Sequence, residues 1–256
     1  MGNLIRMDFY RMRKSRTFLF CLGLTFVLAL ASAPITRWMF TLAKSLAPES
    51  MDTFELKINF SEILSDPFPM LGLMLLMISL CYFFYADVEN GYIKNIAGQV
   101  PKKGLTIISK FIAAIGHNVI FALVGILGNV IGSLFVRQIV MDSAVLDGLR
   151  VLVLKLLLVQ SMTAMLLLAV STFRSKSMGM VLAVLFGLGM TSLIYFGINE
   201  GVNQVFGTHV DISLYMPDTV MSEKPLETLK ALAVACGWGA AFLIPAVLLF
   251  DRKDVK

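Results

Sequence analysis

The sequence contains few side chains that could react or bind a metal. It has only two histidines and three cysteines among 256 residues, and it lacks the H-E-x-x-H pattern in which one helix presents two histidines to zinc. Cys21, Cys81 and Cys236 each lie inside an apolar run, where a cysteine acts as a small hydrophobic residue. The sequence therefore predicts no disulfide framework, no metal site and no enzyme active site.

Charged residues are also scarce. They make up 15% of the chain against 57% hydrophobic residues, and the mean hydropathy is +0.80. A soluble domain carries more charge than this, so lipid must surround most of the chain. The formal net charge of +5 could indicate a nucleic-acid partner, but the basic residues gather beside the apolar runs, as in proteins that contact anionic lipid. We expect membrane lipid, and no nucleic acid, as a partner.

The apolar residues form unbroken runs close to the ~20 residues that a helix needs to cross a bilayer. We therefore predict an all-α membrane protein with a single transmembrane domain over residues 1–256. Its six expected transmembrane helices lie near residues 17–36, 68–86, 105–135, 148–170, 178–198 and 229–250. The third run is longer than one span and is expected to project beyond the membrane.

The segments between these spans differ in charge from one side to the other. The side that holds both termini carries fourteen basic and five acidic residues, and the opposite side carries seven basic and twelve acidic ones. Segments rich in lysine and arginine stay in the cytoplasm, so we expect both termini there. Ala31-Ser32-Ala33 could instead end a cleaved secretory signal. The first run is long enough to span the membrane, however, and we expect it to be retained.

Two segments on the expected cytoplasmic side have patterns of apolar residues that predict short helices outside the spans. Residues 1–16 place Leu4, Ile5, Phe9 and Met12 near one helical face, which predicts an amphipathic helix in the membrane plane. The alternative is a basic start that only sets the topology.

The second segment runs from residue 86 to residue 104. There Gly91 permits a turn, Pro101 ends a short helix, and Tyr92, Ile93 and Ile96 form an apolar ridge. Such a ridge suits a groove on another protein, although a solvated connector is the alternative.

These segments carry a family resemblance. The start Leu4-Ile5-Arg6-Met7-Asp8-Phe9-Tyr10-Arg11, the run Glu89-Asn90-Gly91-Tyr92-Ile93-Lys94-Asn95, the following Pro101, and Lys110 at the third span resemble the permease subunits of ABC-2 type ABC transporters. The likeness is greatest to the six-span permeases of bacterial peptide export and of bacitracin or lantibiotic immunity. It covers essentially the whole chain, and it implies a bacterial plasma membrane and an ABC-2 exporter-like fold.

The resemblance also implies roles and partners. Residues 1–16 would be an elbow helix, formed by Leu4, Ile5, Arg6, Phe9, Tyr10 and Met12. A coupling helix that docks on an ATPase would involve Asp87, Glu89, Asn90, Gly91, Tyr92, Ile93, Lys94, Ile96 and Pro101. The complex would hold two ATPase subunits and a second permease copy or paralogue. No G-x-x-x-x-G-K-[ST] motif occurs in the sequence, so ATP and Mg would bind in the partner subunit, and we expect no cofactor in this chain.

Polar residues at membrane depth are the candidates for a translocation path, because such groups are costly to place in lipid. They are His117, Asn118, Asn129, Lys155, Gln160 and Thr163. Lys155 could instead extend its ammonium to the headgroups, and His117 and Asn118 could bond one helix to another. The segment 199–228 contains apolar patches that could cap the path from outside, or it could be a loose loop.

The leading hypothesis is a permease subunit that exports a hydrophobic or amphipathic substrate, such as a peptide or antibiotic, by ATP-driven alternating access. The alternative is a secondary transporter or channel that needs no ATPase. Ion coupling usually requires carboxylates inside the membrane, whereas all seventeen acidic residues lie outside the predicted spans or at their edges. The sequence therefore favours the ATP-driven permease.

Overall fold

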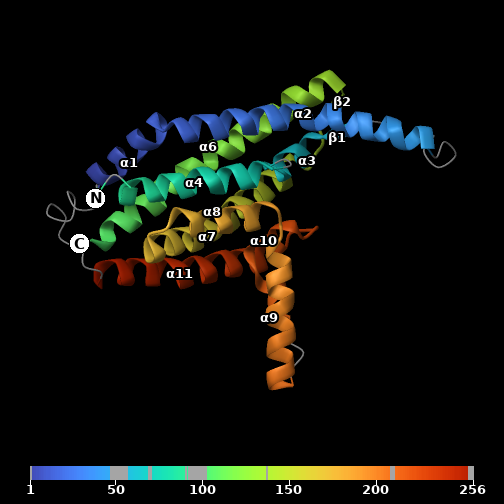
Figure 1. Ribbon diagram of the computed structural model, residues 1–256. Helices are drawn as coiled ribbons and strands as arrows, with labels where there is room; N and C mark the ends of the chain where they lie inside the picture. The colour runs from blue at the N-terminus through green and yellow to red at the C-terminus, as the bar shows by residue number, and fades with distance from the viewer. Residues whose placement is uncertain are drawn as a thin grey trace.

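The computed structural model describes residues 2–46, 57–68, 71–89, 91, 103–136, 138–207 and 211–252. Within these ranges the chain is almost entirely helical (Figure 1). The elements are α1 (Gly2–Lys14), α2 (Arg16–Leu46), β1 (Lys57–Asn59), α3 (Phe60–Ser65), α4 (Gly72–Glu89), α6 (Gly104–Val136), β2 (Gln138–Val140), α7 (Val145–Phe173), α8 (Lys176–Gly187), α9 (Thr191–Phe206), the 3-10 helix η2 (Ile212–Tyr215), α10 (Pro217–Ser222) and α11 (Thr228–Arg252).

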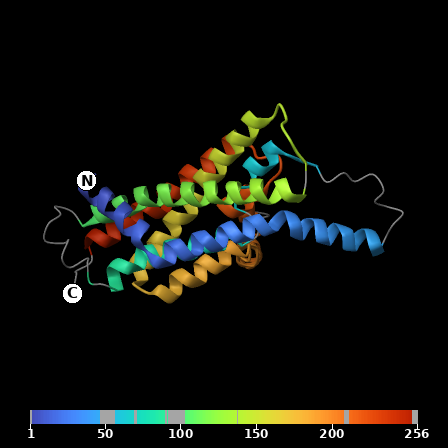
Figure 2. The same cartoon turned by 90° about the horizontal axis from the view of Figure 1, so that it is seen from above.

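Five of the described helices are long and apolar enough to cross a membrane, namely α2, α4, α6, α7 and α11. They lie side by side in one bundle (Figures 1 and 2). Helix α1 begins and α11 ends at the same end of this bundle, here named the terminal end. The opposite end, where β1, β2, α3 and α10 lie, is named the far end. The prediction of an all-α membrane protein is confirmed. The structure also contains two paired strands of three residues each, which the sequence did not predict.

The fifth predicted span, residues 178–198, is not one straight helix but a bent pair of helices, which together are long and apolar enough to count as a sixth span. Helices α8 and α9 meet at a bend of 92°, and α9 projects sideways from the bundle in Figure 1 and is seen along its axis in Figure 2. The break contains Gly189 with a φ of +66°, a conformation that a residue with a Cβ adopts at a cost. Hydropathy alone could not reveal this break, because the residues on both sides of it are apolar.

The helix that contains the first predicted span, residues 17–36, is longer than that span. Helix α2 continues to Leu46 and extends past the rest of the bundle at the far end (Figure 1). The remaining spans begin and end within about four residues of their predicted limits, which is the accuracy expected of hydropathy.

Helices α4 and α7 occupy the middle of the bundle, and each has 56% of its most apolar stretch buried. Their fully buried side chains include Leu76, Leu80, Leu158 and Met162. By contrast, 17% of the corresponding stretch of α11 is buried, and apolar side chains cover its outer surface. Exposed apolar surface of this extent suits contact with lipid chains.

Small residues let α2 and α6 approach closely. A Cβ added to Gly128 would lie 2.6 Å from the Cβ of Ala29, and a Cβ at Gly132 would overlap the carbonyl oxygen of Leu30. The glycines of α6 therefore pack inside the chain, as small residues do between membrane helices.

Candidate functional site: a buried charged cluster and two cavities

A cluster of charges lies at the terminal end, where α1, α4 and α6 meet. Asp87, near the end of α4, forms ion pairs with Arg11 of α1 and with Lys110 of α6; the Lys110 Nζ lies 2.8 Å from the Asp87 Oδ2. The side chains of Asp87 and Lys110 are 6% and 7% exposed. Lys110 also lies over the Phe83 ring, 4.9 Å from its centre. A buried pair with this geometry is costly to separate, because each partner would remain as an uncompensated charge.

Asp8 extends this cluster along α1. Its Oδ2 accepts a hydrogen bond of 2.5 Å from the Ser109 hydroxyl of α6, and the side chain is buried. Burial raises the pKa of Asp8 above its usual value, and this effect exceeds the opposing one of the nearby Lys110 charge. The cluster therefore joins the N-terminal helix to both helices that flank residues 90–103.

The ends of this flanked segment are fixed in the structure. Helix α4 ends at Glu89, and Gly91 follows in the left-handed conformation with a φ of +61°. On the other side, the backbone N–H of Gly104 donates a hydrogen bond of 2.5 Å to the Asp251 Oδ1 of α11. The other predicted coupling residues lie outside the described residues: Asn90, Tyr92, Ile93, Lys94, Ile96 and Pro101.

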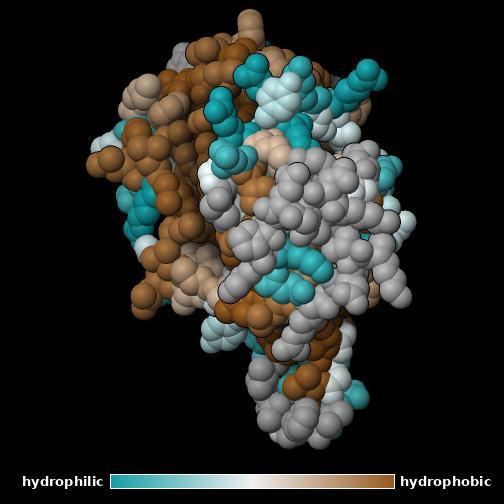
Figure 3. Space-filling view, turned by 90° about the vertical axis from the view of Figure 1, so that its left-hand side faces the viewer, coloured by the Kyte–Doolittle hydropathy of each residue, from teal (hydrophilic) through white to brown (hydrophobic). Residues whose placement is uncertain are grey.

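Helix α1 forms where the amphipathic helix was predicted. Met12 is buried, and the Phe9 ring lies over Gly116 of α6, where a Cβ would collide with it. Leu4 and Ile5 are half-buried, whereas Arg6 and Tyr10 are exposed. The buried face also contains Asp8, which the apolar pattern did not reveal. Figure 3 views this terminal end, where hydrophilic residues lie beside a broad apolar surface.

Three predicted path residues meet inside the bundle. The Asn118 amide donates hydrogen bonds to the Gln160 Oε1 at 2.8 Å and to the Thr163 hydroxyl at 3.3 Å. The Gln160 amide in turn donates to the carbonyl oxygen of Phe111. These polar groups join α6 to α7, which matches the alternative of helix-to-helix hydrogen bonding.

His117 lies apart from these hydrogen bonds. Its ring is fully buried between aromatic rings, with centroid distances of 4.8 Å to Phe18 and 5.1 Å to Phe121. Neither ring nitrogen has a hydrogen-bond partner in the described part of the chain. The predicted path residues therefore do not form one continuous polar channel.

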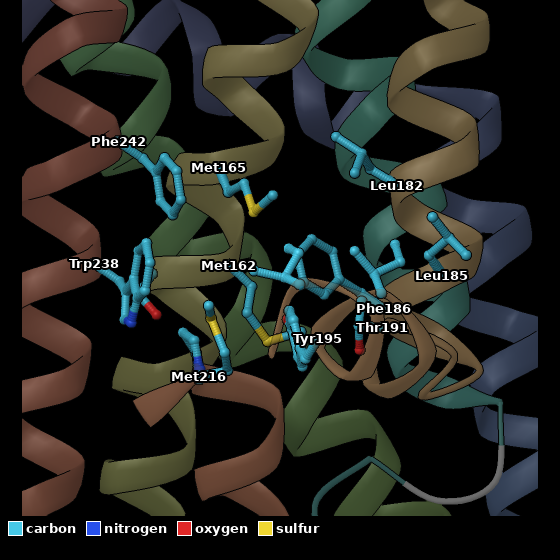
Figure 4. A pocket seen from close by; sticks show the side chains of 14 residues that line it. Met162, Met165, Leu182, Leu185, Phe186, Thr191, Tyr195, Met216, Trp238 and Phe242 are labelled. Atoms are coloured by element: carbon cyan, nitrogen blue, oxygen red, sulfur yellow. The ribbon is translucent and has the colours of Figure 1, made fainter. Parts of the chain in front are cut away.

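A cavity of about 230 Å³ lies where α7, α11, α10 and the bend between α8 and α9 meet (Figure 4). Met162 and Met165 of α7, Phe186 of α8, and Trp238 and Phe242 of α11 line it. Its lining is almost wholly apolar, because the polar groups nearby have partners elsewhere. The Trp238 indole N–H donates to the Tyr215 carbonyl oxygen at 2.6 Å. Flexible thioethers and aromatic rings suit an apolar ligand of variable shape.

One carboxylate holds the bent segment beside this apolar cavity. The Tyr195 hydroxyl of α9 donates a hydrogen bond of 3.0 Å to the Asp218 Oδ1 of α10, and the Thr191 hydroxyl donates to the Asp218 Oδ2. Sequence reasoning missed this cavity, because its lining residues come from separated segments of the chain. The pair Trp238 and Phe242, one helical turn apart, was the available signal.

A second cavity, of about 340 Å³, lies at the far end between α2, α3, α6 and α7. It contains the two remaining predicted path residues, Asn129 and Lys155. Asn129 accepts a hydrogen bond of 2.8 Å from the Ser32 hydroxyl. The Lys155 side chain is 12% exposed, and its Nζ lies 3.6 Å from the Asp66 Oδ1. Its ammonium therefore lies within the bundle rather than in open solvent.

Among the described residues, no group of three or more histidine, cysteine, aspartate or glutamate side chains is placed to hold a metal ion.

Comparison with known proteins gives one finding. The profile of the family described as ABC-2 family transporter protein matches residues 4–190. No curated protein matches the chain. The matched range includes the charged cluster and both flanks of residues 90–103.

Proposed function

Because the chain belongs to the ABC-2 transporter family and is a membrane-spanning permease of an ABC transporter, we propose that it exports an amphipathic substrate with energy from a separate ATPase. The observation that carries this proposal is the charged cluster at the terminal end. Asp87 joins α1, α4 and α6 around residues 90–103, so a force on that segment would reach all three helices. Buried polar networks rigidify the elements that they join, so these three helices would move together.

The proposed orientation places the terminal end in the cytoplasm. It rests on the fourteen basic residues of that side, against seven on the opposite side. In this orientation residues 90–103 face the ATPase, and the far-end cavity faces outward. Two ATPase subunits and a second permease, identical or paralogous, complete the proposed transporter.

The apolar cavity supports an apolar or amphipathic substrate. Its methionine and aromatic lining offers dispersion contacts without fixed polar partners, so it would accept related ligands of different shape. A peptide or peptide antibiotic with apolar side chains meets this requirement. Alternating access would then need movement at the bend between α8 and α9, which lies at the wall of this cavity.

The test changes the segment that would contact the ATPase. Ile93→Asp or Ile96→Asp would place a charge in the proposed groove of the ATPase on which this segment docks. Burial of a charge without a partner is costly there. We expect at least tenfold weaker capture of the ATPase at equal amounts of permease in the membrane, and a matching loss of export. Glu89→Ala should have a smaller effect in the same direction.

Ser177→Asp is the matched control, since it adds the same charge at the same end of the bundle, on the exposed first turn of α8. It should leave capture and export unchanged. Wild-type capture and export by both isoleucine variants would show that residues 90–103 are only a connector.

A further inference from the structure

A shallow apolar groove runs along the outer surface of α11, beside the apolar cavity. Its floor consists of Ala233, Gly237 and Ala241, which follow one another at intervals of about one helical turn, and the groove measures about 370 Å³. A Cβ added to Gly237 would meet nothing within 4 Å. The groove is therefore open above Gly237.

This groove lies at the depth of the lipid hydrocarbon. Trp238, at its edge, is ten residues from the start of α11 and fourteen from its end, which places it roughly 15 Å and 21 Å along the helix from these two points. The hydrocarbon core of a bilayer is about 30 Å thick. Lipid chains are therefore the groups that lie against this part of α11.

Trp238 lies between the groove and the cavity. It lines both, whereas Tyr215 lines the groove and the next residue, Met216, lines the cavity. The indole is held in place, because its N–H bonds to the Tyr215 carbonyl oxygen and its ring stacks on that of Phe242 with centroids 5.2 Å apart. Figure 4 shows Trp238 and Phe242 on one side of the cavity, opposite Phe186.

The cavity offers an occupant almost no hydrogen bond. The Trp238 N–H is already bonded, and the hydroxyls of Thr191 and Tyr195 donate to Asp218. The Ser161 hydroxyl donates to a carbonyl oxygen of its own helix. An apolar cavity of about 150 Å³ stays dry and binds benzene. This cavity, at about 230 Å³, suits a somewhat larger apolar group.

The shape of the groove favours a chain over a compact ring. From Ala233 to Ala241 it follows eight residues of α11, a length of roughly 12 Å. An extended hydrocarbon chain fits along this strip with its end beside Trp238, whereas a compact ring would fill the cavity and leave the groove empty.

We propose that the groove and the cavity form one binding site for a single hydrocarbon chain of a membrane amphiphile. The hydrocarbon chain enters from the lipid beside α11, and its end lies in the cavity next to Trp238. That this amphiphile is the transported substrate rests on the proposed export function. The binding itself does not, and it can be measured on the permease without an ATPase.

The experiment uses the fluorescence of Trp238 in the full permease, purified and placed in phosphatidylcholine vesicles. The other tryptophan, Trp38, is exposed on α2 and is replaced in every variant by Trp38→Phe, so that all tryptophan emission comes from the site. The probe is a lysophosphatidylcholine that carries bromine near the end of its acyl chain, because bromine quenches an indole on contact. Quenching should saturate at a low mole fraction of the probe.

Competition tests whether the site recognises the hydrocarbon chain. Unbrominated lysophosphatidylcholine and dodecyl maltoside, which have different headgroups, should both relieve the quenching. Relief by lysophosphatidylcholine alone would show that the headgroup is recognised and would overturn the proposal.

Gly237→Leu tests the groove, because its added side chain would occupy the floor and would extend into open space. It should raise the mole fraction at half-maximal quenching about tenfold or more, since each methylene that loses its contact lowers the affinity about fourfold. Gly201→Leu is the matched control. Gly201 is another helical glycine with open space around it, and it lies on α9 outside both the groove and the cavity. This variant should saturate as the wild type does.

Two results would overturn the proposal. Quenching that rises in proportion to the probe, without saturation, would show ordinary contact with lipid. Equal half-maximal quenching in the proteins with and without Gly237→Leu would show that the groove is not part of the site. A permease that binds the probe but shows no ATP-dependent export would refute only the proposed function, and one that exports without saturable quenching would refute only this site.

Discussion

Asp87 and Asp8 lie in the same charged cluster but should respond to neutralisation in opposite ways. Asp87→Asn would leave Arg11 and Lys110 without the carboxylate they share, and breaking a buried ion pair costs ~3–5 kcal/mol. Its unfolding temperature in detergent should fall clearly. Asp8→Asn keeps an acceptor for the Ser109 hydroxyl and removes a buried charge, so its unfolding temperature should stay the same or rise. A larger loss in Asp8→Asn than in Asp87→Asn would contradict this reading of the cluster.

The pH dependence of stability follows from the raised pKa of Asp8. Folding favours its protonated form, so the stability this form contributes is present below the ordinary pKa of aspartate and is lost as the pH rises through the raised pKa. Between acidic and neutral pH, the wild-type unfolding temperature should therefore fall relative to that of Asp8→Asn. The comparison of the two proteins at each pH cancels the titration of other groups. A constant difference across this range would show that Asp8 does not titrate there.

At the scale of residues, the sequence revealed which side chains are polar at depth but not how they pair. Asn118, Gln160 and Thr163 were candidates from their positions in apolar runs, and they do meet. The bond between Asp8 and Ser109 joins residues 101 positions apart. Such a contact depends on how α1 packs on α6, which no local pattern specifies.

At the scale of elements, the bend between α8 and α9 depends on Gly189. Alanine at a φ of +66° costs roughly 1 kcal/mol or more. We expect Gly189→Ala to lower the free energy of unfolding by about this amount. Gly197→Ala is the control, because Gly197 lies inside α9 and also has open space around it. There alanine should stabilise the helix by ~0.5–1 kcal/mol.

The two glycine variants differ in backbone conformation and not in available space, so thermal unfolding in detergent separates the causes. If both variants shift the unfolding temperature in the same direction, the left-handed conformation at Gly189 does not determine the bend.

Hydropathy predicted the helices whose apolar length matches the bilayer, and it did not predict where a helix turns. The residues from Met178 to Ile198 read as one span because apolar side chains continue through Leu188 and Met190. The bend also depends on Asp218, whose carboxylate holds Thr191 and Tyr195 from a helix twenty-odd residues further along the chain. Strands β1 and β2, at three residues each, are too short to give a recognisable alternation.

At the scale of the whole molecule, the proposed orientation can be tested by labelling. In a variant that carries Cys236→Ala and keeps the buried Cys21 and Cys81, cysteines introduced one at a time at Ser50 and Ser222 should react with an impermeant thiol reagent in intact cells. Cysteines at Gln99 and Lys256 should react only after the membrane is opened, since their loops carry the positive charge that stays in the cytoplasm. Reaction of the Gln99 cysteine in intact cells would show that this segment lies outside the cell, contrary to the proposed orientation.

Transport by this permease should depend on ATP hydrolysis by another subunit. This dependence is tested most directly by measuring ATP-dependent transport in vesicles that contain the purified chain, with and without that ATPase. The substrate can be an amphipathic peptide to which the transporter confers export in cells. We expect transport when the permease, the ATPase and ATP are all present, and none when any one of them is omitted. Transport by the chain alone, driven by an ion gradient or by the peptide gradient, would contradict this expectation.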